Sequence, residues 1–218
     1  MQDVIFGIVS FAVAAIAFGI GAAKLFRAKK PLYLQILVAA AGCFAVEQLS
    51  LVINLWCDVA VVASIGMFGV FGCNFFLLSA NFGTLDRIVD DGKGSGKARA
   101  LAVIAPVLMA VLDAAAFFAW KDSDLFSAAL WLVMLLPALP ASYFNLKHIL
   151  LPMDPFAFLR ATKPCNIAAL VFYVLTAAYV ICSAQTDSIV SGILSVLMSL
   201  SVLALSLCAI KGAKKWGI

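Results

Sequence analysis

The chain has 218 residues, of which 65% are apolar and only 12% are charged, and its formal net charge is +4. Soluble domains carry about 25% charged residues, so this chain lacks the charge that a water-exposed surface needs. The composition therefore excludes a soluble fold. Long apolar runs recur along the whole sequence, and they predict an all-α, polytopic membrane protein. The runs do not alternate in polarity, which excludes a transmembrane barrel.

Seven membrane-spanning helices are predicted, at about 20 residues per crossing. They occupy residues 4–25, 31–55, 59–83, 99–120, 124–146, 165–185 and 188–210. Together they form a single transmembrane domain, residues 1–218. The connection 86–99 is polar and rich in glycine, so it cannot face lipid. Residues 147–164 are apolar, but Pro152 and Pro155 interrupt them, and we expect no continuous helix there.

The basic residues predict the orientation of the chain. All of the 15 Lys and Arg residues except Lys121 fall in loops on the same side as the carboxyl terminus. Basic loops stay cytoplasmic, so the amino terminus is predicted outside, the carboxyl terminus inside, and the plasma (inner) membrane as the location. These cations are spread over short loops, which favours contact with anionic headgroups over nucleic acid. The tail with Lys211, Lys214, Lys215 and Trp216 is the plainest case.

Motifs for catalysis, metals or cofactors are incomplete. His148 is the only histidine, which excludes a bis-histidine haem and a histidine-rich zinc site. We expect it to be solvated at the end of the fifth span. Residues 92–97 resemble a phosphate-binding loop, but Asp91 stands where its first glycine belongs and Ala98 where its hydroxyl belongs. The sequence therefore predicts no catalytic residue, no metal and no cofactor, and we expect the protein not to be an enzyme.

The six cysteines do not indicate a disulfide framework. Buried packing is the expected role for most of them, because cysteine is among the most readily buried side chains. Cys57 and Cys182 approach the predicted outer face, where a disulfide between them is the alternative.

The end of the third span resembles the acidic-arginine motif of rhodopsin-like receptors, through Asp86 and Arg87. These two residues are predicted as a cytoplasmic gate or output, and interfacial anchoring of the helix end is the alternative. The seventh span carries no Asn-Pro-x-x-Tyr sequence, and it has no lysine before Lys211 to form the Schiff base of a retinal pigment.

An internal repeat is suggested by two similar segments. Residues 27–31 and 160–164 both place an arginine, an alanine and a lysine before a proline, at an offset of 133. At this offset Val38 meets Val171. A second interpretation needs no repeat, because basic residues followed by proline also make a good cytoplasmic helix start.

If the repeat is real, residues 1–85 and 124–212 are parallel halves and 99–120 is a linker helix. This 3+1+3 plan resembles the SWEET sugar transporters and the wider PQ-loop group. The resemblance implies a transporter with a site between the halves. It rests on order and topology, since the Pro-Gln dipeptide of that group is absent from this sequence.

A ligand or proton site is predicted where acids fall inside spans. Glu47 and Asp113 are the two such acids, and each costs about 2.5–3.5 kcal/mol near the bilayer centre on insertion scales. No basic residue lies near the middle of a span to neutralise them, which favours protonated carboxyls that face the bundle interior. Gln48, Asn74 and Tyr173 add polar groups to this predicted site. The alternative is that these residues only join helices, at about 0.6 kcal/mol per hydrogen bond.

Small residues recur along the third span. Gly66, Gly69, Gly72 and Cys73 form a stripe, which predicts close helix packing and not a ligand surface.

Three functions fit the sequence. The first is a small-molecule or proton-coupled transporter, the second a sensor or receptor-like protein, and the third an assembly subunit without its own chemistry. The expected partners are the lipid bilayer and a small molecule or ion of unknown identity, with no nucleic acid. A homo-oligomer stays open.

Overall fold

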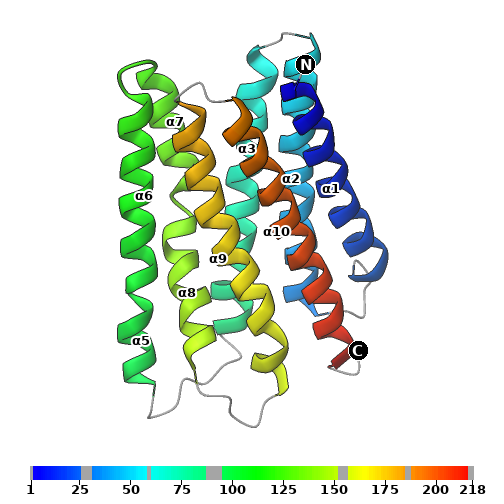
Figure 1. Cartoon of the computed structure of the whole chain (residues 1–218). Coiled ribbons are helices and arrows are strands. Elements are labelled where there is room, and N and C mark those ends of the chain that lie inside the picture. The colour runs from blue at the N-terminus through cyan, green and yellow to red at the C-terminus, as the bar shows by residue number, and fades with distance from the viewer. Residues whose placement is uncertain are drawn as a thin grey trace.

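Seven helical segments, each long and apolar enough to cross a membrane, make up most of the chain. The computed structural model describes residues 2–25, 31–57, 60–86, 95–151, 157–184 and 188–215, and it is helical throughout these ranges except at short turns. The prediction of an all-helical protein with seven spans is confirmed. Figure 1 shows the helices side by side, with the two chain ends at opposite ends of the bundle. We call these the N-terminal end and the C-terminal end.

Four spans are single helices and three are divided. The single ones are α1 (Gln2–Leu25), α2 (Leu32–Cys57), α9 (Ala157–Ser183) and α10 (Ser188–Lys215). The third span joins α3 (Ala60–Leu78) to the π-helix η1 (Ser79–Leu85). The fourth joins α5 (Gly96–Ala102) to α6 (Ile104–Trp120), and the fifth joins α7 (Leu125–Leu135) to α8 (Ala138–Leu150).

Proline explains two of these divisions. Pro106 lies in the first turn of α6, and Pro137 directly precedes α8. Proline has no N–H to donate, and its ring clashes with the carbonyl of the preceding turn, so a helix breaks or bends there. The fifth span is therefore two helices that follow one another.

The connections are shorter than predicted. The helix of the fourth span begins at Gly96 and not at 99, and α8 continues to Leu150. Residues 147–164 do not form one continuous helix, as predicted, because α8 ends at Leu150 and Leu151 is extended. The sixth span begins earlier than predicted, since α9 begins at Ala157 and includes Pro164. Spanning helices accept proline when neighbouring groups satisfy the freed carbonyl. Residues 87–94, Pro152 and Pro155 lie outside the described residues.

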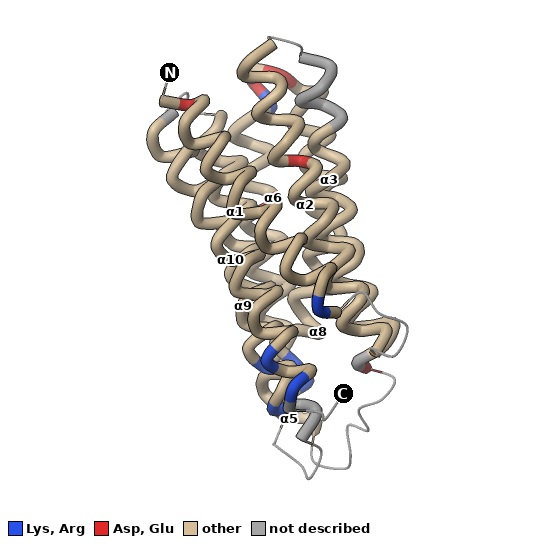
Figure 2. Tube along the Cα trace, turned by 90° about the vertical axis from the view of Figure 1, so that its right-hand side faces the viewer, with Lys and Arg blue, Asp and Glu red and all other residues tan. Residues whose placement is uncertain are grey.

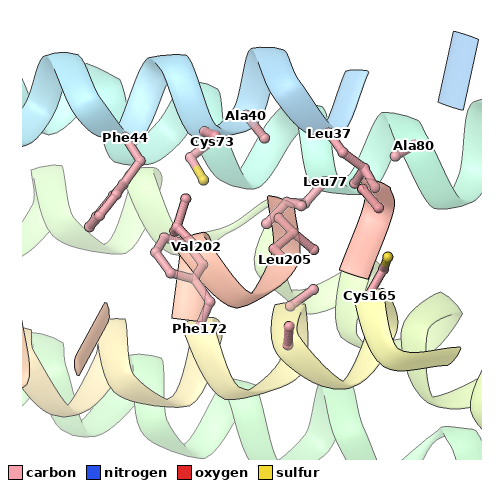
Figure 3. Packing of buried hydrophobic residues seen from close by; sticks show 14 of the residues in the cluster. Leu37, Ala40, Phe44, Cys73, Leu77, Ala80, Cys165, Phe172, Val202 and Leu205 are labelled. Carbon is pink, nitrogen blue, oxygen red and sulfur yellow. The ribbon is translucent and has the colours of Figure 1, made fainter. Parts of the chain in front are cut away.

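The helices close into a ring in which the first and last spans are neighbours. α1 packs between α2 and α10, α2 packs on α3, and α9 packs on α10. α6 packs against α7, α8 and α9. Figure 3 shows the core between these helices, where Phe44 of α2 meets Phe172 of α9 edge to face with 5.2 Å between ring centroids. Leu77 and Leu205 are buried beside them.

Charge and apolar surface are distributed as a membrane requires. Lys and Arg gather at the C-terminal end of the bundle, as Figure 2 shows, while Lys121 follows α6 at the N-terminal end. Large apolar side chains such as Phe68, Val111 and Ile193 are exposed along the sides of the helices. Such continuous apolar surface is not tolerated in water, so lipid must cover it.

The glycine stripe of α3 lies against α2. A Cβ atom on Gly69 would approach both the carbonyl oxygen of Cys43 and the Cβ of Glu47 to 2.6 Å, and one on Gly66 would lie 2.8 Å from the Cβ of Ser50. Neither position has room for a side chain. The prediction of close helix packing is confirmed.

All six cysteines are free thiols. The alternative of a disulfide between Cys57 and Cys182 is therefore not realised in this structure.

Candidate functional site

Polar side chains from three helices meet in the N-terminal half of the bundle. Gln48 of α2 donates from Nε2 to Oε2 of the neighbouring Glu47 over 2.5 Å. Its carbonyl oxygen accepts a hydrogen bond of 3.0 Å from the hydroxyl of Ser195 on α10. That hydroxyl also lies 3.0 Å from the hydroxyl of Ser10 on α1. A serine has one hydroxyl proton, so Ser195 donates to only one of these partners at a time.

A cavity of about 270 Å³ leads to this cluster from the N-terminal end. It lies between α1, α2, α9 and α10. Its polar lining consists of Asp3, Asn54, Tyr179, Ser183, Ser191 and Ser195. Ser195 belongs to both the cavity and the cluster, so a molecule in the cavity would touch the first member of a chain that leads to Glu47. We call the cavity and the cluster together the cavity site.

Glu47 is 2% exposed and has no cationic partner among the described residues. A buried carboxylate without a counter-charge is costly, so the protonated acid is the form that this environment favours. Gly69 of α3 packs directly against Glu47, because a Cβ atom there would lie 2.6 Å from the Cβ of Glu47. The Gln48 amide is its one hydrogen-bond partner in the described structure.

A second group of polar residues occupies the C-terminal half of the bundle. Asp86 follows η1, and its Oδ1 accepts a hydrogen bond from Nζ of Lys147 over 2.5 Å. The same oxygen lies 3.3 Å from Nε2 of His148. Both basic residues belong to α8 and are buried. This arrangement ties the end of the third span to the end of the fifth.

His148 also connects this ion pair to two amides and a tyrosine. Its Nδ1 lies 3.1 Å from Oδ1 of Asn81, whose amide donates to Asn145 over 2.5 Å. Asn145 in turn donates to the hydroxyl of Tyr173 over 3.3 Å. Both ring nitrogens of His148 face acceptor oxygens, so an imidazolium with two N–H donors satisfies both. We call these six residues the C-terminal network.

The prediction that His148 is solvated is wrong. The side chain is 0% exposed, because η1 and α9 pack against α8 and cover it. Its position beside Lys147 near a helix end suggested a free surface, but Lys147 is buried as well.

The π-helix η1 supplies Asn81 to the network. Asn81 also donates to the carbonyl of Leu77, and Thr84 donates to the carbonyl of Ala80. These side chains satisfy carbonyls near the point where α3 changes to π-helical geometry. Single π-helical turns inside α-helices occur frequently at functional sites.

The remaining predicted site residues lie apart from both groups. Asn74 of α3 donates to the carbonyl of Met134 over 3.2 Å, just before the break between α7 and α8. Asp113 of α6 is buried, and neither carboxyl oxygen has a hydrogen-bond partner among the described residues. α6 packs mainly on α7, α8 and α9, so Asp113 is not among the residues that line the cavity.

The predicted site thus separates into parts. Glu47 and Gln48 lie together at the cavity, Tyr173 and Asp86 belong to the C-terminal network, and Arg87 lies outside the described residues.

Sequence reasoning missed several members of both groups. They are Ser10, Asn81, Asn145, Lys147, His148 and Ser195. The two asparagines carried a usable signal, since both fall inside predicted spans, where an amide needs a partner. The serines carried no such signal, because a serine hydroxyl can donate to a backbone carbonyl of its own helix.

Within the described residues, no group of three or more His, Cys, Asp or Glu side chains is placed to hold a metal ion. The chain matches no protein-family model, no curated protein sequence and no solved structure. The fold and the apolar surface define an integral membrane protein with seven helices.

Proposed function

We propose that this protein is a proton-coupled transporter of a small solute, with the cavity site as its binding site. The observation that carries the proposal is a cavity that ends on a hydrogen-bonded chain to an isolated, buried carboxyl. An acid in such a place can take up and release a proton when its surroundings change. Isolated ionisable groups inside membrane bundles mark ion and proton pathways.

The lining favours a neutral or cationic solute. Asp3 is acidic, and the described residues that line the cavity include no Lys or Arg. Hydroxyl and amide groups from Asn54 and Ser183 offer hydrogen bonds, while Phe6 and Tyr179 offer aromatic surface to an amine. The volume of about 270 Å³ is below the range of about 300–1,000 Å³ for drug-sized ligands, so the solute is small.

We infer further that the N-terminal end faces outward and the C-terminal end faces the cytoplasm of the plasma membrane. This orientation is supported by the gathering of Lys and Arg at the C-terminal end. The cavity then opens to the outside, and the packed core around Phe44 and Phe172 separates it from the cytoplasm.

The proposal does not depend on the 3+1+3 repeat. Burial differs between the aligned residues Val38, which is 1% exposed, and Val171, which is 47% exposed. The support for a repeat remains the similarity of the two segments before spans two and six.

Transport is tested in proteoliposomes with an imposed pH gradient. Choline and glucose serve as a cationic and a neutral probe, and internal pH is followed with a trapped dye. Glu47→Gln is expected to abolish proton movement that accompanies uptake. Asp113→Asn is the matched control, because it removes a buried carboxyl that lies outside the hydrogen-bonded chain from the cavity to Glu47. Equal proton movement in Glu47→Gln and the unmodified protein would refute the role of Glu47.

A sensor is the second candidate, and the C-terminal network is the observation that favours it. The network joins η1, α8 and α9 at the end where the basic segments lie. A shift of these helices would therefore change the position of the basic segments. A probe that binds in the cavity without being transported, yet changes amide hydrogen exchange in η1 and α8 of the unmodified protein, would favour this alternative.

A further inference from the structure

Two adjoining hollows lie between α9 and α10 near the C-terminal end, away from the cavity site. The first, of about 260 Å³, is lined by Arg160, Lys211 and Lys214 together with small residues. The second, of about 330 Å³, is almost wholly apolar and is lined by Ile167, Val171 and their neighbours. Pro164 and Cys208 line both hollows, so the two form one continuous groove with a basic end and an apolar end.

The local sequence explains why a groove is present. At its basic end the helices approach closely, since a Cβ on Gly212 would lie 3.2 Å from the carbonyl oxygen of Ala161. Toward the bundle centre, Ala168 and Ala204 line the apolar hollow with side chains too short to fill it. The groove is therefore built into α9 and α10 and does not need a mobile side chain to open.

Charge at the basic end is of one sign. Arg160, Lys211 and Lys214 are exposed, and none of the described residues that line the two hollows is acidic. Three cations in one place repel each other, and an anion among them relieves that repulsion. Lys163, the neighbouring cation on α9, is engaged elsewhere, because it donates to the carbonyl of Leu151 over 3.2 Å.

The length of the groove matches one lipid leaflet. Arg160 and Val171 are the ends of the α9 side, and at 1.5 Å per residue the helix between them rises about 16 Å. This is about half of the hydrocarbon thickness of about 30 Å. A phosphate among the cations thus puts an acyl chain of the same molecule along the apolar hollow. Basic pockets between spanning helices are known to bind anionic lipid headgroups.

We propose that the groove between α9 and α10 binds one anionic phospholipid. Its phosphate lies among Arg160, Lys211 and Lys214, and an acyl chain lies along Pro164, Ala168 and Ala204. This site is separate from the proposed transport site, and it requires neither a direction of transport nor a solute. It differs from general attraction of basic tails to a membrane because one headgroup and one chain are held in a defined place.

The test measures lipid retention by native mass spectrometry of the detergent-purified full chain, titrated with phosphatidylglycerol or phosphatidylcholine. The headgroup variant is Lys211→Gln/Lys214→Gln. The matched control is Lys24→Gln/Lys97→Gln, which removes the same charge from the same end of the bundle but outside the groove. We expect a single phosphatidylglycerol adduct, whose affinity falls by about tenfold in the headgroup variant and by less than about twofold in the control.

A second variant tests the apolar half. Ala204→Phe fills the chain hollow and keeps every cation, so it is expected to weaken phosphatidylglycerol binding without changing the weak binding of glycerol 3-phosphate. Far-ultraviolet circular dichroism and gel filtration confirm that each variant is folded.

Three outcomes would overturn the proposal. The first is an equal loss in the headgroup variant and its control, which shows general electrostatic attraction. The second is equal retention of phosphatidylcholine. The third is binding of glycerol 3-phosphate as strong as that of the lipid, which shows a site for a soluble phosphate.

Discussion

The cavity site and the C-terminal network are both buried polar clusters, but they use their polar groups in different ways. In the network, Asp86 receives two basic side chains, and the amides of Asn81 and Asn145 are joined to His148 and Tyr173. In the cavity site, Glu47 has the Gln48 amide as its one described partner, and Ser195 borders open space. The polar groups of the network form hydrogen bonds with one another, whereas the cavity site has polar groups that can form hydrogen bonds with a ligand.

The difference separates two roles that look the same in the sequence. Polar residues inside membrane spans serve either as joints between helices or as contacts for a substrate. Satisfied partners and opposite charges indicate a joint. An isolated acid beside a cavity indicates a contact. The C-terminal network therefore holds η1, α8 and α9 together, and removing its members should cost stability more than removing members of the cavity site.

The largest effect is expected for Asp86→Ala. Lys147 and His148, which are buried, would then lose a carboxylate that is itself 24% exposed, and removing one partner of such a partly buried charged pair costs about 3 kcal/mol. The unfolding free energy in detergent micelles measures the loss. Asp122→Ala, the same change at an exposed position, should cost almost nothing. Replacing Lys147 by methionine as well should recover part of the loss. A loss below about 1 kcal/mol for Asp86→Ala would show that the C-terminal network does not hold these helices together.

Gly69→Ala should destabilise the wall behind the cavity site by about 2 kcal/mol, because the added methyl group collides with the backbone of Cys43 and with Glu47. Gly19→Ala on α1 is the control, since no described atom beyond its own stretch of helix lies within 4 Å of its Cβ position. Thermal unfolding in detergent compares the two variants. If both melt alike, the contact between α2 and α3 is looser than the structure describes.

A matched pair of amide replacements tests the comparison directly. Asn145→Leu leaves Asn81 and Tyr173 without their partner and should cost about 1–3 kcal/mol. Gln48→Leu removes one hydrogen bond between spanning helices, typically about 0.6 kcal/mol, and also leaves Glu47 without its described partner, so we expect a total cost of about 1 kcal/mol. The two unfolding free energies are measured under the same conditions. The reverse order would show that the cavity site, and not the C-terminal network, holds the bundle together.

The smallest effect concerns the start of α7, outside the membrane-spanning part. Asp124 accepts hydrogen bonds from the Ser127 hydroxyl and from the backbone N–H groups of Ser127 and Phe126, and these bonds lower its pKa. A lowered pKa in the folded state adds stability above the ordinary aspartate value of about 3.9, and this stability is lost as the pH falls through the folded-state pKa.

Melting temperatures between pH 6 and pH 3 measure this contribution. The unmodified protein should lose slightly more stability toward pH 3 than Asp124→Asn, whose amide still caps the helix but does not titrate. Parallel curves for the two proteins would mean that the cap does not depend on the charge.

The sequence predicted those members of the site whose side chains are costly inside a membrane span. Glu47 and Gln48 were predicted together because both are costly inside a span, and they do lie together. The same argument predicted that Tyr173 and Asp113 belong to this site. In the structure Tyr173 belongs to the C-terminal network, and Asp113 does not line the cavity. Depth along a helix is readable from residue number, but the direction in which a side chain points depends on which helices are neighbours.

The sequence by itself determined the class of protein, the number of spans and the gathering of charge at one end. These follow from composition and from length per crossing, which are local and additive. Only the tertiary structure decided that α1 closes the ring against α10, that His148 is buried, and that Ser10 and Ser195 join Gln48 at a cavity. Apolar helices can pack in many orders with similar burial, because lipid is as apolar as leucine, so side-chain fit and specific polar pairs select the arrangement.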